Sequence, residues 1–291
     1  MRWNILKFGA AVGAVLAVQP ASAASPAVQA AESALYLDAG LMHTQYHENI
    51  SPGDDESGFQ AGLGGGGSYL RPADPRVTNG ADFYAALDYG LSAGGITYSG
   101  HTQQIVGNAI VYAPLAATDN AQFNRIEIRL GAGFPLIGGA ESIPFVVGGY
   151  QTWSRNLSSS KQSQQGEFYR SGMLGVGWKF DVPIGQAVVV SATAEIYDLV
   201  GGSVTFNNFF TNSDNLNNSF GASPEERIEL GLDDAFGAHT HLLFKAFYEH
   251  FSYTGSAPKN ETDAAGNQFS VREPSSTTSQ FGANVGVGYS F

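Results

Sequence analysis

The sequence has no cysteine, few charges and no long apolar run after its first two dozen residues. Without cysteine the chain has neither a disulfide framework nor thiol chemistry. Since no later stretch of 18 apolar residues occurs, a helical membrane protein is excluded. Charged residues make up 14% of the chain, against about a quarter in ordinary soluble domains. This composition is expected of a β-barrel whose outer wall is apolar and whose lumen is polar.

Positive charge is also scarce, which bears on the partners and cofactors. The formal net charge of −12 becomes −14 once the two cations near the N-terminus are removed. This balance disfavours binding to nucleic acid. No phosphate-binding loop or HExxH motif occurs, and Gly64–Gly67 fall within a predicted strand, so we expect no cofactor. His239 and His241 share one strand face and could hold a metal, but a solvated turn is the simpler interpretation.

The first 24 residues have the pattern of a cleaved signal peptide. Arg2 and Lys7 supply the positive start, and the apolar stretch that follows ends before Pro20. Ala21-Ser22-Ala23 has the small-x-small form that signal peptidase recognises. The apolar stretch is too short to span a membrane as a helix, and no stop-transfer pattern follows it. The pattern predicts export through the general secretory route and a mature domain at 25–291.

Apolar and polar residues alternate with a period of two in about ten segments of the remaining chain. Residues 125–134 show this most clearly, with apolar side chains at even positions and charged residues or glycine at odd positions. The alternation predicts an all-β fold, a single antiparallel up-and-down transmembrane β-barrel. The predicted strands are residues 34–46, 59–70, 81–98, 125–134, 143–155, 168–182, 188–197, 227–232, 242–249 and 277–291.

The connections between these segments alternate in length. Short turns rich in Gly, Pro or Asp are predicted at 71–80, 135–142, 183–186 and 233–238. Long polar loops are predicted at 47–58, 99–121, 156–167, 201–223 and 254–276. Short turns at one end and long loops at the other are typical of outer-membrane barrels, whose turns are periplasmic and whose loops are extracellular.

The last strand carries a motif of alternating apolar residues and ends on an aromatic residue. It resembles the last strand of bacterial outer-membrane β-barrel proteins, and the whole chain is similar to the small porin-like and opacity-protein-like barrels. The resemblance implies location in the outer membrane, contact with its lipid and lipopolysaccharide, and recognition by periplasmic chaperones and the barrel-assembly machinery. The residues that carry this assembly signal are Phe281, Val285, Val287, Tyr289 and Phe291.

The inward-facing side chains include charges of both signs. In a lumen only slightly wider than that of an eight-stranded barrel, these charges must pair, because unpaired buried charges are costly. A plugged barrel with a structural or surface role is one interpretation. A narrow, weakly cation-selective pore is the other, because acidic residues are in excess. The predicted lumen charges are Asp38, Asp82, Asp88, Arg125, Glu127, Arg129, Arg170, Lys179, Asp181, Glu195, Arg227, Glu229, Lys245 and Glu249.

Two side chains near the outer end of the ninth strand offer a different function. His250 and Ser252 share one strand face, and the alternation places them on the lipid side. With Glu261 or Glu273 to orient the imidazole, His250 could activate the Ser252 hydroxyl as the nucleophile of a hydrolase that removes acyl chains. The pair resembles the His-x-Ser motif of outer-membrane lipid A deacylases. That motif continues into Asn where this chain has Tyr253, and those enzymes have eight strands. The paired Asp and Asp–His sets of the ten-stranded omptin proteases are not found at the predicted strand tops.

The cleavage site yields the first testable prediction. Mature protein should start at Ala24 or within two residues of it, because the small-x-small sequence ends at Ala23. N-terminal sequencing of protein from the outer-membrane fraction measures the start. An intact Met1, or recovery from the inner membrane, would contradict the predicted export.

Overall fold

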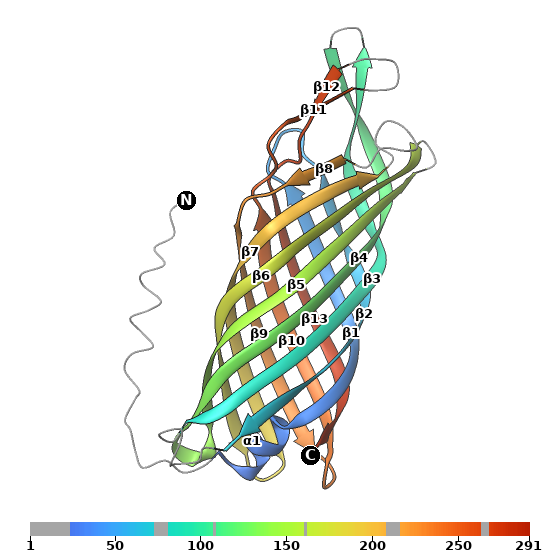
Figure 1. The fold of residues 1–291 in the computed structure, drawn as a ribbon. Helices are drawn as coiled ribbons and strands as arrows, with labels where there is room; N and C mark the ends of the chain where they lie inside the picture. The colour runs from blue at the N-terminus through green and yellow to red at the C-terminus, as the bar shows by residue number, and fades with distance from the viewer. Residues whose placement is uncertain (1–23, 73–80, 107–108, 160–161, 208–215, 263–267) are drawn as a thin grey trace.

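The structure is a computed structural model that describes residues 24–72, 81–106, 109–159, 162–207, 216–262 and 268–291 (Figure 1). All but the last residue of the predicted signal segment at 1–24, and most of the predicted turn at 71–80, lie outside these residues. The described chain winds into one barrel of long, strongly tilted strands (Figure 1).

Ten long antiparallel strands form the wall. Strands β1 to β7 each pair with their sequence neighbours, β9 pairs with β7 and β10, and β13 pairs with β10 and β1, so the ring is closed. Closure leaves no strand edge in hydrocarbon, where unpaired backbone groups cost several kcal/mol each. The predicted ten-stranded antiparallel barrel is confirmed. Its strands are β1 (Ala34–Glu48), β2 (Asp55–Arg71), β3 (Asp82–Val106), β4 (Ala109–Pro135), β5 (Glu141–Ser159), β6 (Gln162–Ile184), β7 (Val188–Asn207), β9 (Ser223–Ala235), β10 (Thr240–Tyr253) and β13 (Ser276–Ser290).

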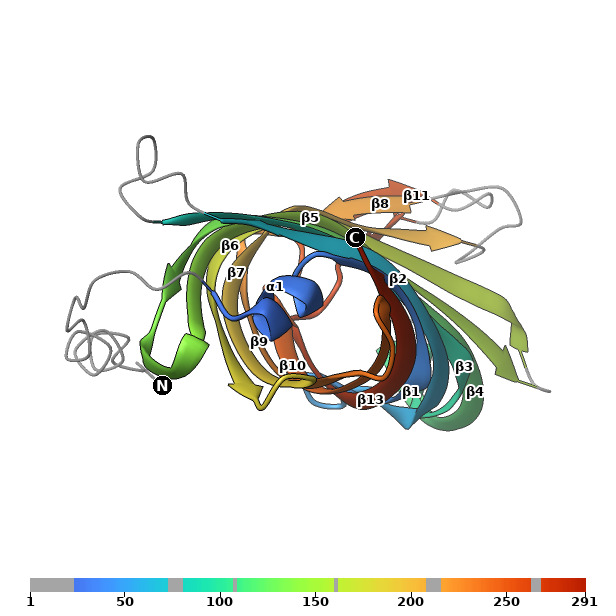
Figure 2. The ribbon, with the colours of Figure 1, turned by 90° about the horizontal axis from the view of Figure 1, so that it is seen from below.

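Short elements lie at the two ends of the barrel. At the lower end, helix α1 (Pro26–Ala31) lies inside the ring of strands, and the 3-10 helix η2 (Ile137–Gly139) links β4 to β5 (Figure 2). At the upper end, β8 (Leu216–Ser219) extends the sheet beside β7, while β11 (Lys259–Thr262) and β12 (Gln268–Val271) form a separate hairpin. No described helix has the length and hydropathy needed to cross a membrane.

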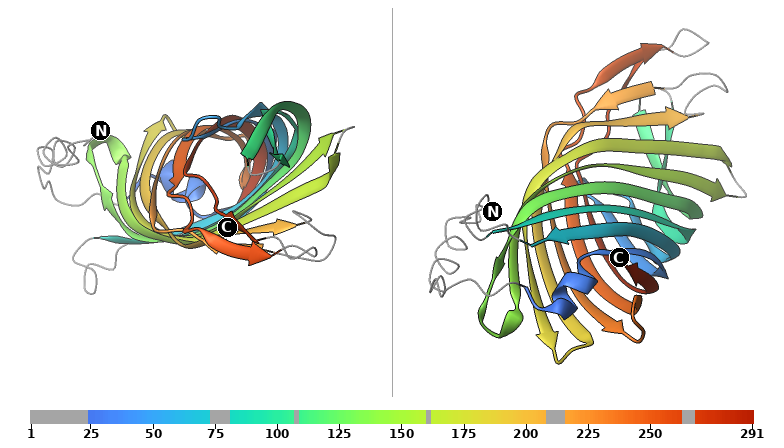
Figure 3. Two further views of the ribbon diagram at one scale, coloured as in Figure 1. Left: turned by 90° about the horizontal axis from the view of Figure 1, so that it is seen from above. Right: turned by 60° about the horizontal axis from the view of Figure 1, so that its bottom comes forward.

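Two of the predicted long loops are instead extended hairpins. Strands β3 and β4 stay paired as far as Val106 and Ala109, so most of the predicted loop at 99–121 is sheet. Strands β5 and β6 likewise pair as far as Ser159 and Gln162, across the predicted loop at 156–167. Polar residues can continue a ladder in water, because the backbone pairing does not require an apolar face. The sheet therefore continues past the closed ring of strands as projecting hairpins (Figures 1 and 3).

The outer wall carries a continuous band of exposed apolar side chains. Leu37 is 70% exposed and Leu63 is 65% exposed, although both are leucines in regular strands. An apolar surface that runs around a whole barrel is suited to lipid. One member of the band from each wall strand, taken in chain order, is Leu37, Leu63, Leu87, Ile128, Val146, Val176, Ile196, Ile228, Phe244 and Val285.

Aromatic rings flank this band at both ends. At the lower end Phe291 stacks on Tyr69, with ring centroids 6.3 Å apart and planes at 19°. At the upper end the His43 ring lies between Phe59 and Phe281, at 4.7 and 4.9 Å. Such belts are typical of the two membrane interfaces. The last aromatic residue therefore lies at the lower interface, where β13 closes the ring.

The side chains of β7 change phase at a β-bulge. Gly201 and Gly202 lie opposite the single residue Ser171 of β6, and Gly201 has a φ of 62°. This backbone conformation suits glycine, which has no Cβ to clash. Below the bulge odd-numbered residues such as Tyr197 are buried, and above it even-numbered residues such as Val204 are buried.

The position of the last residue yields a prediction about assembly. Phe291→Ser should lower the yield of folded barrel, because it removes a ring stack worth about 1 kcal/mol and the aromatic end of the closing strand. Phe269→Ser, a change in the β11–β12 hairpin outside the barrel wall, is the matched control. Heat-modifiable migration on a semi-native gel reports the folded fraction. Equal losses from both changes would show that the end of β13 has no special part in assembly.

Candidate functional site: the lumen and the outer rim

Helix α1 partly fills the lower mouth of the barrel (Figure 2). Ser25 caps it by accepting a hydrogen bond from the Val28 N–H at 3.2 Å, and Pro26 occupies the first turn, where its missing N–H costs nothing. Val28 is fully buried. Just after the helix, Glu32 forms an ion pair with Lys179 of β6. The chain that leads into β1 therefore acts as a short plug.

The middle of the lumen is built around Arg125. Its guanidinium contacts Glu127 at 2.6 Å, Glu225 at 2.5 Å and Glu249 at 2.6 Å, and it lies 5.0 Å from the centre of the Tyr197 ring. All of these side chains are buried. A buried cation is tolerated only when it is paired and hydrogen-bonded. Arg125 meets this condition with carboxylates from three strands, and so ties β4 to β9 and β10.

The neighbouring cations are paired in the same way. Arg129 contacts Asp88, Glu127 and Glu195 at 2.6, 2.9 and 2.6 Å. The remaining pairs are Arg227 with Glu229 and Glu249, each at 3.0 Å, and Lys245 with Asp38 at 3.7 Å. Because Arg125, Arg129 and Arg227 share Glu127 and Glu249 as partners, their ion pairs form one network, and Lys245 with Asp38 is a separate pair.

The glycine run of β2 makes room for one of these pairs. A Cβ on Gly64 would collide with the Asp38 carboxylate, which lies across the strand at that point. The absent side chain lets Asp38 remain on the wall within reach of Lys245. A glycine within a strand allows either close packing or a bend, and at Gly64 the structure shows close packing.

The structure places the predicted lumen charges on the inner face, with one exception. Arg170 is exposed, and its Nε donates to Ser203 Oγ at 2.9 Å. On β6 the inward side chains are odd-numbered, as Lys179 and Asp181 show, so an even-numbered residue points out. The prediction for Arg170 is wrong. The inward members are Asp38, Asp82, Asp88, Arg125, Glu127, Arg129, Lys179, Asp181, Glu195, Arg227, Glu229, Lys245 and Glu249.

Several inward charges are not among the predicted ones. Glu225 has the same parity as Glu229 but precedes the predicted start of that strand at residue 227. Carrying the alternation past the predicted strand ends would have found it. Among the further buried or partly buried charges are Glu32, Glu48, Glu56, Asp119, Glu141, Arg155, Glu167, Asp233 and Glu273.

Two small cavities remain inside the network. One, of about 80 Å³, lies above α1 beside Glu32 and Lys179. The other, of about 120 Å³, lies beside Arg125. They share Arg129 and Glu229 as lining residues. A buried water molecule needs about 10–15 Å³ of such space, so each cavity has room for several waters.

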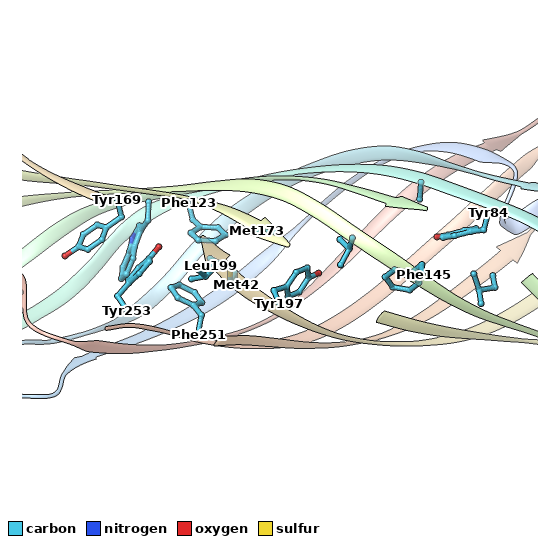
Figure 4. Packing of buried hydrophobic residues seen from close by; sticks show 14 of the residues in the cluster. Met42, Tyr84, Phe123, Phe145, Tyr169, Met173, Tyr197, Leu199, Phe251 and Tyr253 are labelled. Atoms are coloured by element: carbon cyan, nitrogen blue, oxygen red, sulfur yellow. The ribbon is translucent and has the colours of Figure 1, made fainter. Parts of the chain in front are cut away.

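A layer of aromatic rings lies inside the barrel, on the side of Tyr197 away from Tyr84 (Figure 4). Arg125 packs against Tyr197, so this layer lies above the Arg125 network. Phe123 of β4 stacks on Phe251 of β10 at 6.2 Å, and Phe251 meets the edge of Trp153 of β5 at 6.4 Å. Tyr169 of β6 lies 5.6 Å from Trp153 and 5.5 Å from Tyr253. These rings come from four strands and are buried. The layer separates the Arg125 network from the upper end of the lumen.

A second network lies above the aromatic layer, beyond the apolar band. Arg155 binds Glu56, contacts Glu167 at 2.6 Å, and donates to the Tyr169 hydroxyl at 2.9 Å. Its guanidinium also covers the Tyr46 ring at 4.2 Å. Arg155 thus repeats the role of Arg125 near the outer end.

The connection from β10 to β13 covers this upper network. The Tyr169 hydroxyl donates to the Glu273 carboxylate at 2.5 Å, so Glu273 points down into the barrel. Ser256 and Glu273 join the two sides of the connection, since each backbone N–H donates to the other residue, at 2.9 and 2.8 Å. Asn49 N–H adds a bond to Ser275 O at 2.8 Å. We call residues 254–258 and 272–275 the upper cover.

Burial changes the acidity of the carboxyl groups around the cover. It raises the pKa of Glu48 to about 7, with the Asp54 carboxylate as the next cause. It raises the pKa of Asp119 to about 8, helped by the nearby Glu56. Burial, and then Glu167, raises the pKa of Glu273 well above its usual range. These groups hold protons in the folded barrel at a pH where the unfolded chain has released them.

The residues of the predicted hydrolase, His250, Ser252 and Glu261 or Glu273, do not form one site in the structure. His250 and Ser252 point outward as predicted, but the hydrogen-bonding partner of His250 Nδ1 is Ser279 Oγ of β13, at 3.0 Å. Glu273 lies inside the barrel on Tyr169. The side chain of Glu261 is outside what the structure describes, and its backbone lies in β11.

The two histidines of the predicted metal alternative contact different groups. His239 Nδ1 lies 3.0 Å from Ser290 O, and its ring stacks on Tyr289. His241 is buried, with Nδ1 2.6 Å from Asp233. Among the described residues no group of three His, Asp or Glu side chains has metal-binding geometry.

Comparison with known proteins identifies the fold. No protein-family model and no curated protein sequence matches this chain. The outer-membrane protease OmpT from Escherichia coli is similar in structure, with a TM-score of 0.54 at 10% identity over 89% of this chain and 97% of that one. The fold is that of a bacterial outer-membrane β-barrel. This supports location in the outer membrane.

Less similar structures belong to the same class of barrel. The translocator domain of the autotransporter NalP from Neisseria meningitidis has a TM-score of 0.40 at 12% identity, over 89% of each chain. Neisserial surface protein A has a TM-score of 0.31 at 8% identity, over 88% of this chain and 97% of that one. At such identities the likeness concerns the fold alone, and no activity is carried over from it.

The raised pKa values yield a prediction for the upper cover. Since folding raises these pKa values, the cover should be most stable at pH 5, and its stability should fall as the pH rises to 8.5. For Glu48 the shift corresponds to at most about 3 kcal/mol. Hydrogen exchange of the described cover residues, corrected for intrinsic rates, measures the change.

Glu48→Gln should flatten this pH dependence, because the amide does not titrate. Glu226→Gln, at an exposed position on the outer wall of β9, is the control and should leave the dependence unchanged. Faster corrected exchange at pH 5 than at pH 8.5 would contradict the prediction.

Proposed function

We propose that this barrel is a closed outer-membrane protein with a structural or surface-interaction role, and that it does not conduct solutes. The observation that carries the proposal is the aromatic layer between the Arg125 and Arg155 networks. With α1 below and the upper cover above, five successive levels block the lumen: α1, the Arg125 network, the aromatic layer, the Arg155 network and the upper cover.

Opening the middle of the lumen would be energetically costly. Arg125 has three carboxylate partners, and removing one partner from a buried pair typically costs about 3–5 kcal/mol. The aromatic rings above it would also have to leave their packed positions. Thermal motion of single side chains does not supply such energies, so a persistently open pore is not expected.

The outer end offers the surface for interaction. The β3–β4 hairpin and the β11–β12 hairpin project from the upper end of the barrel (Figures 1 and 3), which in this proposal faces the space outside the cell. Paired strands hold such projections in shape better than irregular loops do. We therefore place the partner-binding role at these hairpins.

The remaining expected partners follow from the wall and from the end of the chain. The apolar band would contact outer-membrane lipid, and the exposed guanidinium of Arg170 suits the anionic groups of lipopolysaccharide. Export by the general secretory route, followed by periplasmic chaperones and the barrel-assembly machinery, would bring β13 to its place beside β1. No part of the proposal requires a cofactor.

A narrow cation-selective pore is the second candidate. It is favoured by the two cavities, which share lining residues, and by the excess of carboxylates in the lumen. Its weakness is the aromatic layer, across which neither cavity extends. A hydrolase is not proposed, because His250 pairs with Ser279 rather than with Ser252.

Single-channel recording of the refolded protein in planar bilayers tests the proposal. Wild type should give no conductance steps at high salt, because the lumen is filled. The double change Trp153→Ala and Phe251→Ala, which opens the aromatic layer, should give steps or at least raise the current. Tyr150→Ala, on the outer face of β5, is the control and should behave as wild type.

Steps from wild type would overturn the closed barrel. The pore candidate then predicts that Glu229→Gln and Glu249→Gln each lower the preference for cations. Unchanged selectivity in both would exclude these carboxylates as its cause.

A further inference from the structure

The lower mouth of the barrel holds a buried carboxylate without a hydrogen-bonding partner among the described residues. Glu141, at the start of β5, is 0% exposed, and neither of its oxygens makes a hydrogen bond. Asp181 lies opposite it on β6, and the Asp82 and Glu141 side chains both lie beside Gly133. Glu32 joins this acidic group through Lys179, which also lies 3.7 Å from Asp181. A buried carboxylate in acidic surroundings calls for a cation.

The described cation nearby is already engaged. Lys179 pairs with Glu32 and lies 3.7 Å from Asp181. Its ammonium therefore serves two carboxylates, and the cluster around Glu141 remains in negative excess. A further cation with several donors would balance it.

The chain just before α1 passes this cluster. Ser25 N–H donates to Gly139 O at 3.3 Å, and Gly139 lies two residues before Glu141. Ala24 is only 8% exposed and packs within the buried cluster. In the view from below, the segment ahead of α1 runs beside the turn between β4 and β5 (Figure 2).

We propose that the α-ammonium group created by cleavage after Ala23 binds the carboxylate of Glu141 and holds the plug in the lower mouth. The proposal rests on the predicted cleavage site. An α-ammonium group carries one positive charge and three donors, and Glu141 offers two free oxygens. The carboxylate would also offset the repulsion between this ammonium and the positive end of α1.

The proposal makes seating of the plug a consequence of maturation. Before cleavage, residue 24 contributes a neutral peptide N–H, and the Glu141 cluster keeps its excess charge. Cleavage supplies the missing cation at the position where the plug begins. The lower mouth would then be completed only in the mature chain.

The test uses full-length mature barrel, refolded from a chain that begins at Ala24. The rate of amine acylation at the N-terminus is followed by mass spectrometry across pH, which yields the pKa of the α-ammonium. In wild type this pKa should lie at least one unit above its ordinary value of about 8. In Glu141→Gln it should fall to or below that value, with at least about fivefold faster acylation at pH 8.

Glu167→Gln, in the upper network, is the matched control and should leave the N-terminal pKa as in wild type. Heat-modifiable migration confirms that each variant is folded. An unchanged pKa in folded Glu141→Gln would overturn the proposal, and so would an ordinary pKa in wild type. Because the refolded chain starts at Ala24 by design, this result is separate from N-terminal sequencing, which tests where the cell cleaves the protein.

Discussion

The pairing of charges across a narrow lumen is the constraint on which the rest of this barrel depends. Charged side chains are costly on a surface that contacts lipid, so the charged residues of the spanning strands face the lumen. A barrel of ten strands leaves little space for water there. Arg125 resolves the conflict by binding carboxylates from β4, β9 and β10 at once. The network therefore joins strands that are far apart along the wall, and it adds ties that backbone pairing alone does not provide.

The aromatic layer follows from the same constraint. Two charged networks in direct contact would need a continuous set of balanced partners along the whole barrel. Rings such as Trp153 and Phe251 fill the width of the lumen without adding charge, so the networks below and above can each be balanced locally. Arg155 at the outer end and Arg125 in the middle are thus the centres of two separate networks, in each of which one arginine binds several carboxylates.

Alternation was enough to predict the ten strands and most of the charges in the middle of the lumen, because a wall with lipid on one side repeats every two residues. The inner charges at the two ends of the barrel, such as Arg155 and Glu141, were not predicted. Alternation failed where that cause is absent. The outer parts of β3 and β4 have water on both faces, so the alternation there is weak and the sequence predicts a loop.

Helix α1 has only six residues, too few for a helical period, although Ser25 and Pro26 are helix-start signals. The prediction for Arg170 was wrong because the alternation was not followed along β6, where inward residues such as Lys179 have odd numbers and Arg170 has an even one. Hydrogen bonds such as that of His250 to Ser279 depend on strand register, which the sequence does not show.

The bulge at Gly201 has a consequence for how such a barrel can vary. A single extra residue there lets β7 present the opposite set of side chains above the bulge while the lipid-facing set below it is unchanged. Above the bulge, the residues that face outward therefore need not follow the alternation of apolar residues that lipid requires below it. An insertion or deletion of one residue at this point would exchange the inner and outer side chains of the projecting segment alone. The surface that meets the environment can thus diverge without altering the part that the membrane requires.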